Sequence, residues 1–291
     1  MSYIILTDSC SDLNPEIIAR FDQLEILPMS FTIKGVTSAE SFDSDEKAKD
    51  YYDRLRAGET STTAQVSPGE FYDTFMAHAK KGEAVLGLIF SSALSGTYAS
   101  ACMARDMVLE EHPEATIELL DTLGASAGEG LMVYDALINR EKGMSLEENA
   151  ATLREHVQTY AHWFTVDDLN FLKRGGRCSP SAAFFGSMLK VKPVLHVDAQ
   201  GRLIPRSKVR GRHQSLKALA AKFGELGASP DQTVFISHGD CKEDAQLVKD
   251  MLVSQYGCDP EKIILSVIGP VIGSHSGPGT VALFFRGRDR G

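Results

Sequence analysis

Residues 84–98 read AVLGLIFSSALSGTY, and this stretch decides the fold class. Its first seven residues are nearly all apolar, which is typical of a strand buried on both faces. A turn rich in hydroxyl groups follows, and apolar residues then recur at helical spacing from Thr97 to Glu110. A buried strand, a short turn and a helix form half of a βαβ unit. We therefore expect a parallel sheet covered by helices.

The turn itself, Ser91–Tyr98, is the first candidate binding site. It follows the carboxyl end of the strand, which is where open α/β sheets place their ligands. Its hydroxyl groups and backbone N–H groups are donors that suit an anion at a helix N-terminus. Ordinary capping of the helix by Ser92 or Ser95 explains the same residues equally well.

The composition is that of a globular protein, and it limits the classes of partner. The chain has 291 residues, of which 43% are hydrophobic and 24% charged, and its formal net charge is −9. This negative charge argues against nucleic acid and anionic membrane surfaces as partners. No apolar run approaches the roughly 18 residues that span a membrane, and the first residues lack the pattern of a signal peptide. We expect a cytoplasmic protein without integral membrane association.

The cysteines and the common catalytic signatures give no sign of a metal or a cofactor. The five cysteines are scattered and include no C-x-x-C pair, so their spacing predicts neither a zinc site nor a disulfide framework. Reduced thiols are the expectation for a cytosolic chain. The signatures G-x-S-x-G, H-E-x-x-H and the Walker A sequence are missing as well.

Strand and helix patterns alternate up to residue 160 and change character after it. A hairpin pattern around Gln200-Gly201 then interrupts the alternation. We predict two intimately packed α/β domains, residues 1–160 and residues 161–291. The first is expected to contain a mostly parallel, helix-covered sheet, and the second a mixed sheet with helices.

Four further expectations concern particular segments. Residues 25–33 are predicted to form one strand, whereas residues 60–66 are too poor in apolar side chains for a core strand. Residues 180–188 predict a short apolar helix with two phenylalanines at its centre. Residues 269–279 contain four glycines and two prolines and are predicted to form a loop.

His275 lies within this glycine-rich segment. A histidine there can orient hydroxyl groups or offer positive charge to an anion, and a purely structural role is equally open. Asp8 and Asp12 follow the first predicted strand, where an Asx turn and a helix cap are favoured over a phosphoryl-transfer site. An enzyme that uses Asp8, Ser95 and His275 for phosphoryl or acyl transfer is the alternative to a binding protein.

Six short motifs are spread over nearly the whole chain. They are Thr7-Asp8-Ser9 with Asp12, Thr63-Ala64-Gln65-Val66-Ser67-Pro68, Ser91-Ser92 with Leu94-Ser95-Gly96-Thr97-Tyr98, Gly175-Gly176-Arg177, Lys190-Val191-Lys192-Pro193-Val194 and the His275 segment. In this combination and order they resemble the motifs of the DegV family. The resemblance implies a two-domain α/β fold related to the dihydroxyacetone-kinase fold, and a bacterial fatty-acid-binding protein without catalytic activity of its own.

The resemblance also implies a ligand, a partner and a set of site residues. One long-chain fatty acid would lie with its carboxylate at the Ser95 turn and its tail in an apolar tunnel between the domains. A separate fatty acid kinase would convert that carboxylate to an acyl phosphate, which feeds phospholipid synthesis. The positions that match the carboxylate contacts are Thr63, Ser95 with the backbone of Gly96, and His275. Arg177 matches a position near the head group or the kinase face.

The chain departs from the family's usual Thr-Ser-Gln-Pro-Ser-Pro at Ala64 and Val66, so one serine hydroxyl is lost while Thr63 survives. The remaining hydroxyl groups and a helix N-terminus can hold a carboxylate without a buried Lys or Arg, which suits a carrier. A tail of roughly 16 carbons buries methylene groups at about 0.8 kcal/mol each and supplies most of the affinity. Residues 184–188 and Met103 are candidate tunnel walls, with plain core packing as the alternative.

Residues 202–212, RLIPRSKVRGR, concentrate positive charge in an otherwise acidic chain. We expect Arg210 and Arg212 in this segment, together with Arg177, to face an acidic surface or the nucleotide phosphates of the kinase. Encounter would then be steered electrostatically. A solvated hairpin edge is the alternative interpretation of the same charges.

Overall fold

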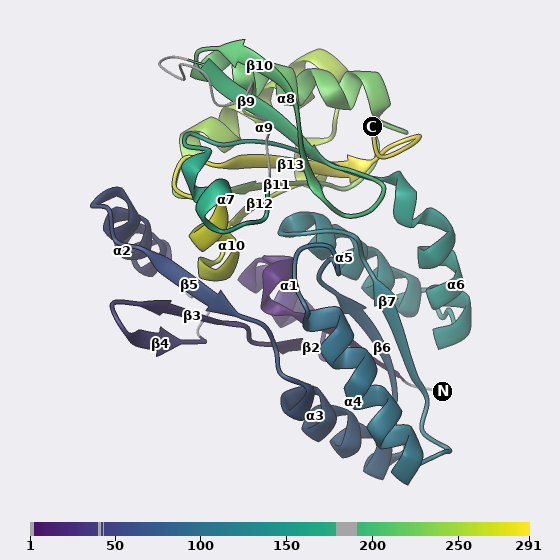
Figure 1. Cartoon of the computed structure of the whole chain (residues 1–291). Coiled ribbons are helices and arrows are strands. Elements are labelled where there is room, and N and C mark those ends of the chain that lie inside the picture. The colour runs from purple at the N-terminus through teal and green to yellow at the C-terminus, as the bar shows by residue number, and fades with distance from the viewer. Residues whose placement is uncertain (1–2, 40–41, 43, 179–190) are drawn as a thin grey trace.

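The computed structural model describes residues 3–39, 42, 44–178 and 191–291. Two large sheets lie one above the other, and helix α5 (Ala127–Glu141) packs between them (Figure 1). This arrangement follows from the alternation of strands and helices in the first half of the chain and the hairpin in the second.

The lower sheet in Figure 1 is parallel and has the strand order β2-β1-β6-β7. Helices α3 and α4 cover one face of this sheet, and α1, α5 and α6 cover the other. The strands are β1 (Tyr3–Asp8), β2 (Leu24–Leu27), β6 (Ala84–Ile89) and β7 (Ile117–Asp121). The other helices are α1 (Pro15–Arg20), α3 (Pro68–Lys81), α4 (Thr97–Glu111) and α6 (Leu146–His156).

Local sequence sets the ends of these helices. Helix α3 begins with a capping box, in which the Ser67 side chain accepts from the backbone N–H of Glu70 and the Glu70 side chain accepts from that of Ser67. It ends at Gly82, whose φ of +69° suits a residue without a side chain. The connection between β6 and α4 is the hydroxyl-rich turn, so the predicted strand, turn and helix are confirmed.

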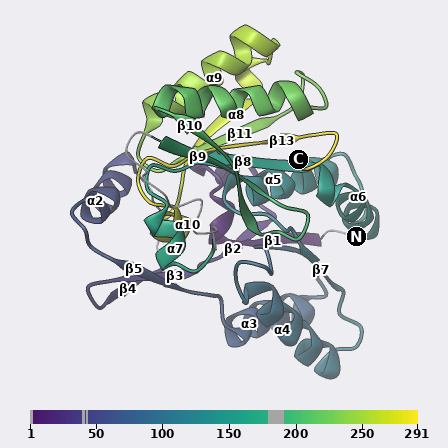
Figure 2. The ribbon, with the colours of Figure 1, turned by 45° about the horizontal axis from the view of Figure 1, so that its top comes forward.

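The upper sheet is mixed and has the order β10-β9-β8-β13-β11-β12 among the described residues. Only the β11–β12 pair is parallel in this sheet. Helices α8 (Arg212–Leu226) and α9 (Lys242–Tyr256) cover its outer face (Figure 2). The strands are β8 (Tyr160–Thr165), β9 (Val191–Val197), β10 (Leu203–Arg210), β11 (Val234–His238), β12 (Ile263–Val267) and β13 (Val281–Arg286).

One hydrophobic core joins the two sheets. It contains Ile5 and Leu86 from the lower sheet, Phe164 and Phe284 from the upper sheet, and Leu131 from the helix between them. The predicted fold class, two intimately packed α/β domains with a parallel and a mixed sheet, is therefore confirmed. The domain boundary at residue 160 stays a prediction.

A third, small antiparallel sheet projects to the side of the molecule and has the order β4-β3-β5 (Figure 1). Its strands are β3 (Ser30–Ile33), β4 (Val36–Ser38) and β5 (Ser61–Ala64), and helix α2 (Asp45–Arg56) packs beside it. The predicted single strand 25–33 is wrong, because Pro28 separates β2 from β3, which lie in different sheets. Residues 61–64 do form a strand, outside the two large sheets, where alternating exposure permits polar side chains.

The prediction of a loop over the glycine-rich segment 269–279 is wrong. Residues 270–276 form helix α10 (Pro270–Ser276), with proline at its first position and Gly277 at φ +79° after its end. Glycine inside the helix reflects close packing, since a Cβ at Gly273 would lie 2.6 Å from the Tyr52 hydroxyl. The predicted helix at 180–188 lies outside the described residues.

The remaining helices are short. They are α7 (Asn170–Arg174) and the 3-10 turns η1 (Ser9–Ser11), η2 (Val157–Thr159) and η4 (Pro260–Lys262). Within the described ranges, no helix combines the length and the apolar character that crossing a bilayer requires.

Candidate functional site

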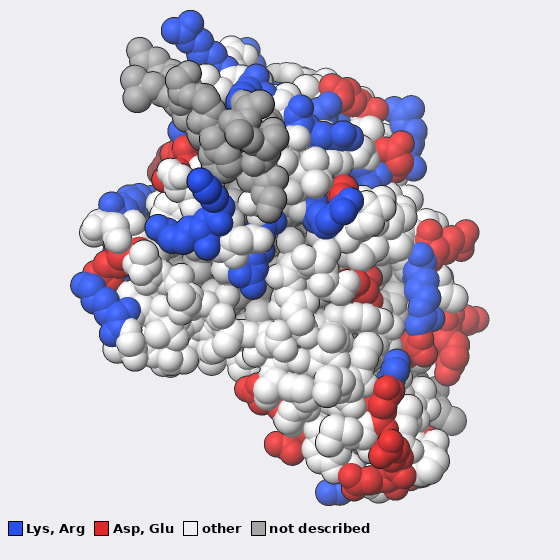
Figure 3. Space-filling model, viewed as in Figure 1, with Lys and Arg blue, Asp and Glu red and all other residues white. Residues whose placement is uncertain are grey.

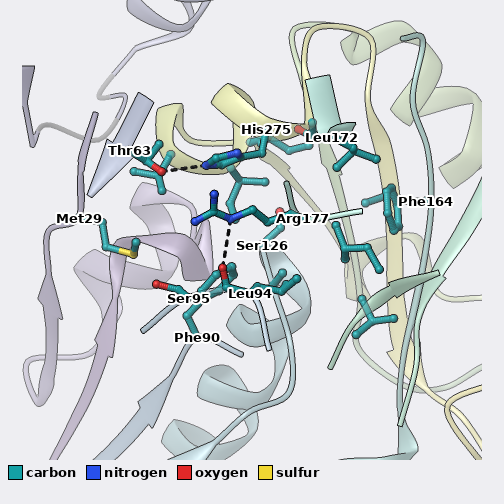
Figure 4. A pocket seen from close by; sticks show the side chains of 18 of the residues that line it. Met29, Thr63, Phe90, Leu94, Ser95, Ser126, Phe164, Leu172, Arg177 and His275 are labelled. Carbon is teal, nitrogen blue, oxygen red and sulfur yellow. Dashed lines mark hydrogen bonds between the residues drawn. The ribbon is translucent and has the colours of Figure 1, made fainter. Parts of the chain in front are cut away.

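A cavity of about 340 Å³ lies between the two large sheets, next to the carboxyl end of β6 (Figure 4). Sites for small molecules commonly enclose about 300–1,000 Å³. The hydroxyl groups of Thr63 and Ser95 and the His275 imidazole lie on one side, beside Met29 and Phe90, and hydrophobic side chains such as Phe164 and Leu172 form the opposite side. We call these the polar wall and the apolar wall.

The polar wall centres on a contact between Thr63 and His275 (Figure 4). Thr63 lies on β5 and His275 on α10, and Thr63 Oγ1 is 2.8 Å from His275 Nε2. The other ring nitrogen, Nδ1, is buried without a hydrogen-bond partner among the described residues. Gly175 packs against it, since a Cβ there would lie 2.2 Å from Nδ1. Burial, followed by the charge of Arg177, lowers the pKa of His275 to about 4, so the ring is neutral near pH 7.

A second set of hydrogen bonds holds the same two elements together. Ser274 Oγ lies 2.7 Å from Ser61 Oγ and 2.8 Å from the hydroxyl oxygen of Tyr51 on α2. Ser61 lies two residues before Thr63, and alternate residues of a strand share a face. Ser274 directly precedes His275 in α10. We call Tyr51, Ser61 and Ser274 the hydroxyl clasp, because it fixes β5 against α10 and so holds Thr63 against His275.

The Ser95 turn completes the polar wall. Ser95 Oγ accepts a hydrogen bond from the Thr97 N–H at 3.3 Å, and both Ser95 and Gly96 line the cavity. Gly96, and neither Ser92 nor Ser95, occupies the N-cap position of α4, although the Ser95 hydroxyl accepts from the N–H of Thr97, the first residue of the helix. A larger residue at Gly96 would have to displace the end of the Gln65 side chain, since a Cβ there would lie 2.3 Å from Gln65 Oε1.

The three predicted cations lie in different places. Arg177 lines the cavity, where its Nε donates to the carbonyl of Leu94 at 3.2 Å (Figure 4). Arg210 is exposed at the end of β10 and does not line the cavity. Arg212 is held within its own domain, where its Nε donates to Asp244 at 2.8 Å. Lys and Arg side chains gather on the upper half of the face in Figure 3, whereas acidic side chains gather toward its lower right.

The apolar wall comes from the inner face of the upper sheet. Phe164 on β8 and Ala282 and Phe284 on β13 line the cavity, and Leu203 of the β9–β10 hairpin joins them. The prediction of Met103 as a wall residue is wrong. Its side chain is 58% exposed, because it lies on the face of α4 that points away from the sheet. The other predicted wall segment, 184–188, lies outside the described residues.

The structure does not bring together the three residues of the enzyme alternative. Asp8 is fully buried, accepts hydrogen bonds from two backbone N–H groups at 3.0 Å each, and does not line the cavity that holds Ser95 and His275. Burial raises the pKa of Asp8 to about 6 and that of Asp12 to about 7. The described residues contain no group of three or more His, Cys, Asp or Glu side chains that could hold a metal ion.

Sequence reasoning missed the hydroxyl clasp, although part of it left a signal. Ser61 and Thr63 alternate along a strand, and Ser274 adjoins His275, so the two candidate site residues each have a hydroxyl neighbour. Tyr51 carries no such signal, because its partner Ser274 lies 223 positions away. Contacts of that separation depend on the packing of α2 on α10.

Comparison with known proteins places the chain in a family. A family model described as an uncharacterised protein of the DegV family matches residues 2–288. A DegV domain-containing protein of Clostridium perfringens is 40% identical over 98% of this chain and 97% of that protein. A fatty-acid-binding DegV family protein of Thermus thermophilus has a TM-score of 0.87 at 28% identity, covering 98% of this chain and 99% of that one.

A second solved structure agrees with the first. The fatty acid binding DegV family protein of Streptococcus agalactiae has a TM-score of 0.84 at 29% identity, with 98% of both chains covered. The likeness in sequence and in structure thus extends over nearly the whole chain, including both large sheets. The chain belongs to the DegV family.

Proposed function

We propose that this cavity, which we name the acyl cavity, binds one long-chain fatty acid. Its carboxylate lies at the polar wall, among Thr63, Ser95, the backbone of Gly96 and His275, and its tail lies along the apolar wall. The observation that carries this proposal is that a single cavity joins the hydrogen-bonding groups of Thr63, Ser95 and His275 to a surface of hydrophobic side chains. Fatty-acid binding by DegV relatives that are similar over nearly their whole length supports it.

The hydrogen bonding of the His275 ring indicates how the site binds a carboxylate. Its buried Nδ1 faces no acceptor among the described residues, so a proton on that nitrogen would be left without a partner. We therefore assign the proton to Nε2, from which it is donated to Thr63 Oγ1. The Thr63 hydroxyl then keeps its own proton for a ligand oxygen. The neutral ring orients this donor and does not act as a counter-ion.

The balance of forces suits a carrier that releases its ligand. Each buried methylene group contributes about 0.8 kcal/mol, so the apolar wall supplies most of the affinity. Neutral hydroxyl groups hold the carboxylate less tightly than a buried ion pair would, and the Arg177 guanidinium, which also lines the cavity, donates to the carbonyls of Leu94 and Gly175. In our proposal the chain does not catalyse a reaction itself, and a separate kinase phosphorylates the bound carboxylate.

Analysis of the purified protein tests the ligand directly. Native mass spectrometry should show a mass increase that disappears on denaturation, and lipid extraction should recover a fatty acid. The delipidated protein should take up one equivalent of fatty acid on addition. A protein that purifies empty and takes up no fatty acid of any tested length would contradict the proposal.

We propose further that the kinase docks on the basic face near the mouth of the cavity. Arg177 lines the cavity and Arg210 is exposed on β10, an edge strand of the upper sheet. We expect Arg212 to contribute less, because its guanidinium is engaged by Asp244 at 2.8 Å. Docking by exposed charges should weaken as the salt concentration rises.

A charge reversal tests this docking surface. Arg210→Glu should slow acyl-phosphate formation by a kinase that accepts the wild-type protein, and should leave fatty-acid affinity unchanged. Lys80→Glu is the matched control, since Lys80 is exposed on α3, away from the cavity. Equal rates for both variants, or loss of fatty acid from Arg210→Glu, would argue against the docking role.

A further inference from the structure

A second cavity, of about 330 Å³, lies between the edge strands β2 and β12 of the two large sheets. It is separate from the acyl cavity, which lies next to the end of the central strand β6. The proposed binding of a fatty acid does not use it. The side chains that bear on its chemistry are Asp12, Ile18, Ile26, His238, Lys242 and Leu265.

Asp12 gives this cavity a carboxylate without a cationic partner. It is 8% exposed, and it accepts hydrogen bonds from the Gly269 N–H at 2.8 Å and the Ser126 hydroxyl at 2.5 Å, which are both neutral donors. Among the described residues, no Lys, Arg or His forms an ion pair with it. Asp8 lies close enough to add negative potential, and burial raises the pKa of Asp12 itself to about 7, so its carboxylate is fully charged only above that pH. A cation in the cavity would therefore be attracted to Asp12.

His238 supplies a ring nitrogen, Nε2, that lacks a hydrogen-bond partner among the described residues. The residue is only 5% exposed, and its Nδ1 accepts a hydrogen bond from the Cys241 N–H at 3.4 Å. That bond assigns the proton to Nε2, which has no hydrogen bond within the described part of the chain and lies on a side chain that lines the cavity. Burial lowers the pKa of His238, so it offers a neutral N–H donor.

The cavity also carries apolar surface that the described residues leave partly exposed. Ile18, on α1, is 42% exposed although it is a large aliphatic residue, and Ile26 and Leu265 line the cavity with it. Lys242 also lines the cavity, and its ammonium lies 3.5 Å from the exposed carboxylate of Asp45. Above about pH 7 the cavity thus combines the Asp12 carboxylate and the His238 N–H donor inside with a partly exposed aliphatic patch.

We propose that this second cavity binds a small organic ammonium compound with an apolar body. The ammonium group contacts the Asp12 carboxylate, and the apolar body covers Ile18, Ile26 and Leu265. An oxygen on the ligand, where present, accepts from His238 Nε2. A hydrogen bond between two charged groups is stronger than one between neutral groups, so charge decides the selectivity of the site.

Two probes of the same shape test the claim on the full chain. Benzylamine carries the ammonium group and benzyl alcohol does not, and saturable binding of each is measured at about pH 8, above the Asp12 pKa, by ligand-observed NMR and calorimetry. Benzylamine should bind at least about tenfold more tightly than benzyl alcohol, as expected for a charge-assisted hydrogen bond. No saturable binding of benzylamine, or equal affinities for the two probes, would overturn the proposal.

Two variants locate the binding. Asp12→Asn removes the charge and should abolish the preference for benzylamine. Asp12 is buried, so its replacement can impair folding. Ile18→Trp therefore serves as the second variant. It fills the rim of the cavity from a residue that is 42% exposed, where a larger side chain can be accommodated. It should remove benzylamine binding, while Met103→Trp, at the 58% exposed Met103, should not.

The result for the second cavity and the result for fatty-acid binding can be told apart. Fatty-acid affinity is measured on the same samples and should be unchanged in Ile18→Trp. Benzylamine binding that survives Ile18→Trp places the probe elsewhere and overturns this proposal without touching the fatty-acid proposal. Failure to bind fatty acid, with benzylamine selectivity intact, overturns only the latter.

Discussion

The two walls of the acyl cavity are built in opposite ways (Figure 4). The polar wall takes one or two residues from each of three segments, namely β5, the turn before α4, and α10. The apolar wall is largely the inner face of one sheet, where β8 and β13 pair side by side. A few positions with specific partners therefore face a broad surface of interchangeable hydrophobic contacts.

Because of this difference, the two walls contribute differently to the affinity and to the orientation of the bound ligand. A hydrophobic wall stabilises the complex in proportion to the area it covers, and tolerates small changes. A hydrogen-bonded wall contributes about 0.5–1.5 kcal/mol for each bond but loses more when a partner is left unsatisfied. We expect the tail to determine how tightly the ligand binds and the polar wall to determine which end lies where.

The largest effect is expected from filling the apolar wall. Ala282 is 4% exposed and lines the cavity on β13, so Ala282→Trp should occupy space needed by the tail. Displacing about four methylene groups at about 0.8 kcal/mol each weakens binding by about 3 kcal/mol, or roughly 100-fold. Titration with a fluorescent fatty acid measures this.

The matched control for that experiment is Ala282→Val, which adds less volume and should weaken binding only slightly. Thermal unfolding of both variants reports whether the fold survives. Wild-type affinity in a folded Ala282→Trp protein would remove β13 from the tail-binding surface.

The next largest effect should come from the polar wall. The double variant Thr63→Val with Ser95→Ala removes two hydroxyl groups and leaves the backbone donors, so we expect a loss of about 1–3 kcal/mol in binding. Calorimetry with a saturated fatty acid gives the value. Ser92→Ala, at an exposed serine of the same turn that does not line the cavity, controls for the loss of a hydroxyl from this segment. If the double variant bound like the wild type, the assignment of the carboxylate would be wrong.

A smaller effect is expected from the hydroxyl clasp. Tyr51→Phe removes the hydroxyl that lies 2.8 Å from Ser274 Oγ, and so loosens α10 against β5. We expect about a twofold to fivefold loss of affinity for a fatty acid and a smaller loss for its methyl ester, because the ester carbonyl accepts weaker hydrogen bonds than a carboxylate does.

Comparison of the acid with the ester makes that test specific. A general loss of stability would weaken both ligands alike. Tyr72→Phe is the control, because the Tyr72 hydroxyl donates to Glu111 at 2.7 Å on the far side of α3 and α4. Parallel losses for acid and ester in Tyr51→Phe would mean that the clasp supports the fold and does not position the head group.

The smallest expected effect is that of pH, between 8 and 6, on fatty-acid affinity through His275, and it should be close to zero. Burial holds the pKa of His275 at about 4 in the unliganded protein, so lowering the pH from 8 to 6 leaves the ring neutral. His275 should therefore not change fatty-acid affinity in this range. NMR titration of the His275 ring protons measures the pKa, and a value near 6.5 would contradict a neutral polar wall.

The lowered pKa of His275 also makes the free energy of unfolding depend on pH. The folded pKa lies below the unfolded value of about 6.5, so between these values the unfolded chain binds more protons. The contribution of His275 to the free energy of unfolding is present above about pH 6.5 and is lost as the pH falls toward 4. The pH dependence of unfolding in His275→Gln should lack this component.

The fold class and half of the polar wall could be predicted from the sequence because their causes are local. The apolar run of β6, the serine-rich turn and the helical spacing of α4 are contiguous, so the position of Ser95 at the end of a strand follows from its immediate neighbours. The capping box of α3 is equally local, with Ser67 and Glu70 three residues apart.

The sequence could not show how far-separated segments pair. Residues 61–64 are too polar to resemble a core strand, yet β5 forms by pairing with β3. Helix α10 lies in a segment whose glycines suggest a loop, and Gly273 within it instead allows Tyr51 and Tyr52 to approach closely.

Sequence by itself determined the α/β architecture and the acidic character of the chain, and its resemblance to the DegV family supplied the candidate head-group residues. Tertiary structure alone decided that Thr63 meets His275 across 212 positions, that Arg212 is taken up by an internal ion pair, and that Met103 faces outward. The physical reason is the range of the forces involved. Strand and helix patterns arise between near neighbours, whereas a hydrogen bond between distant residues exists only once packing has brought both donors and acceptors to one wall.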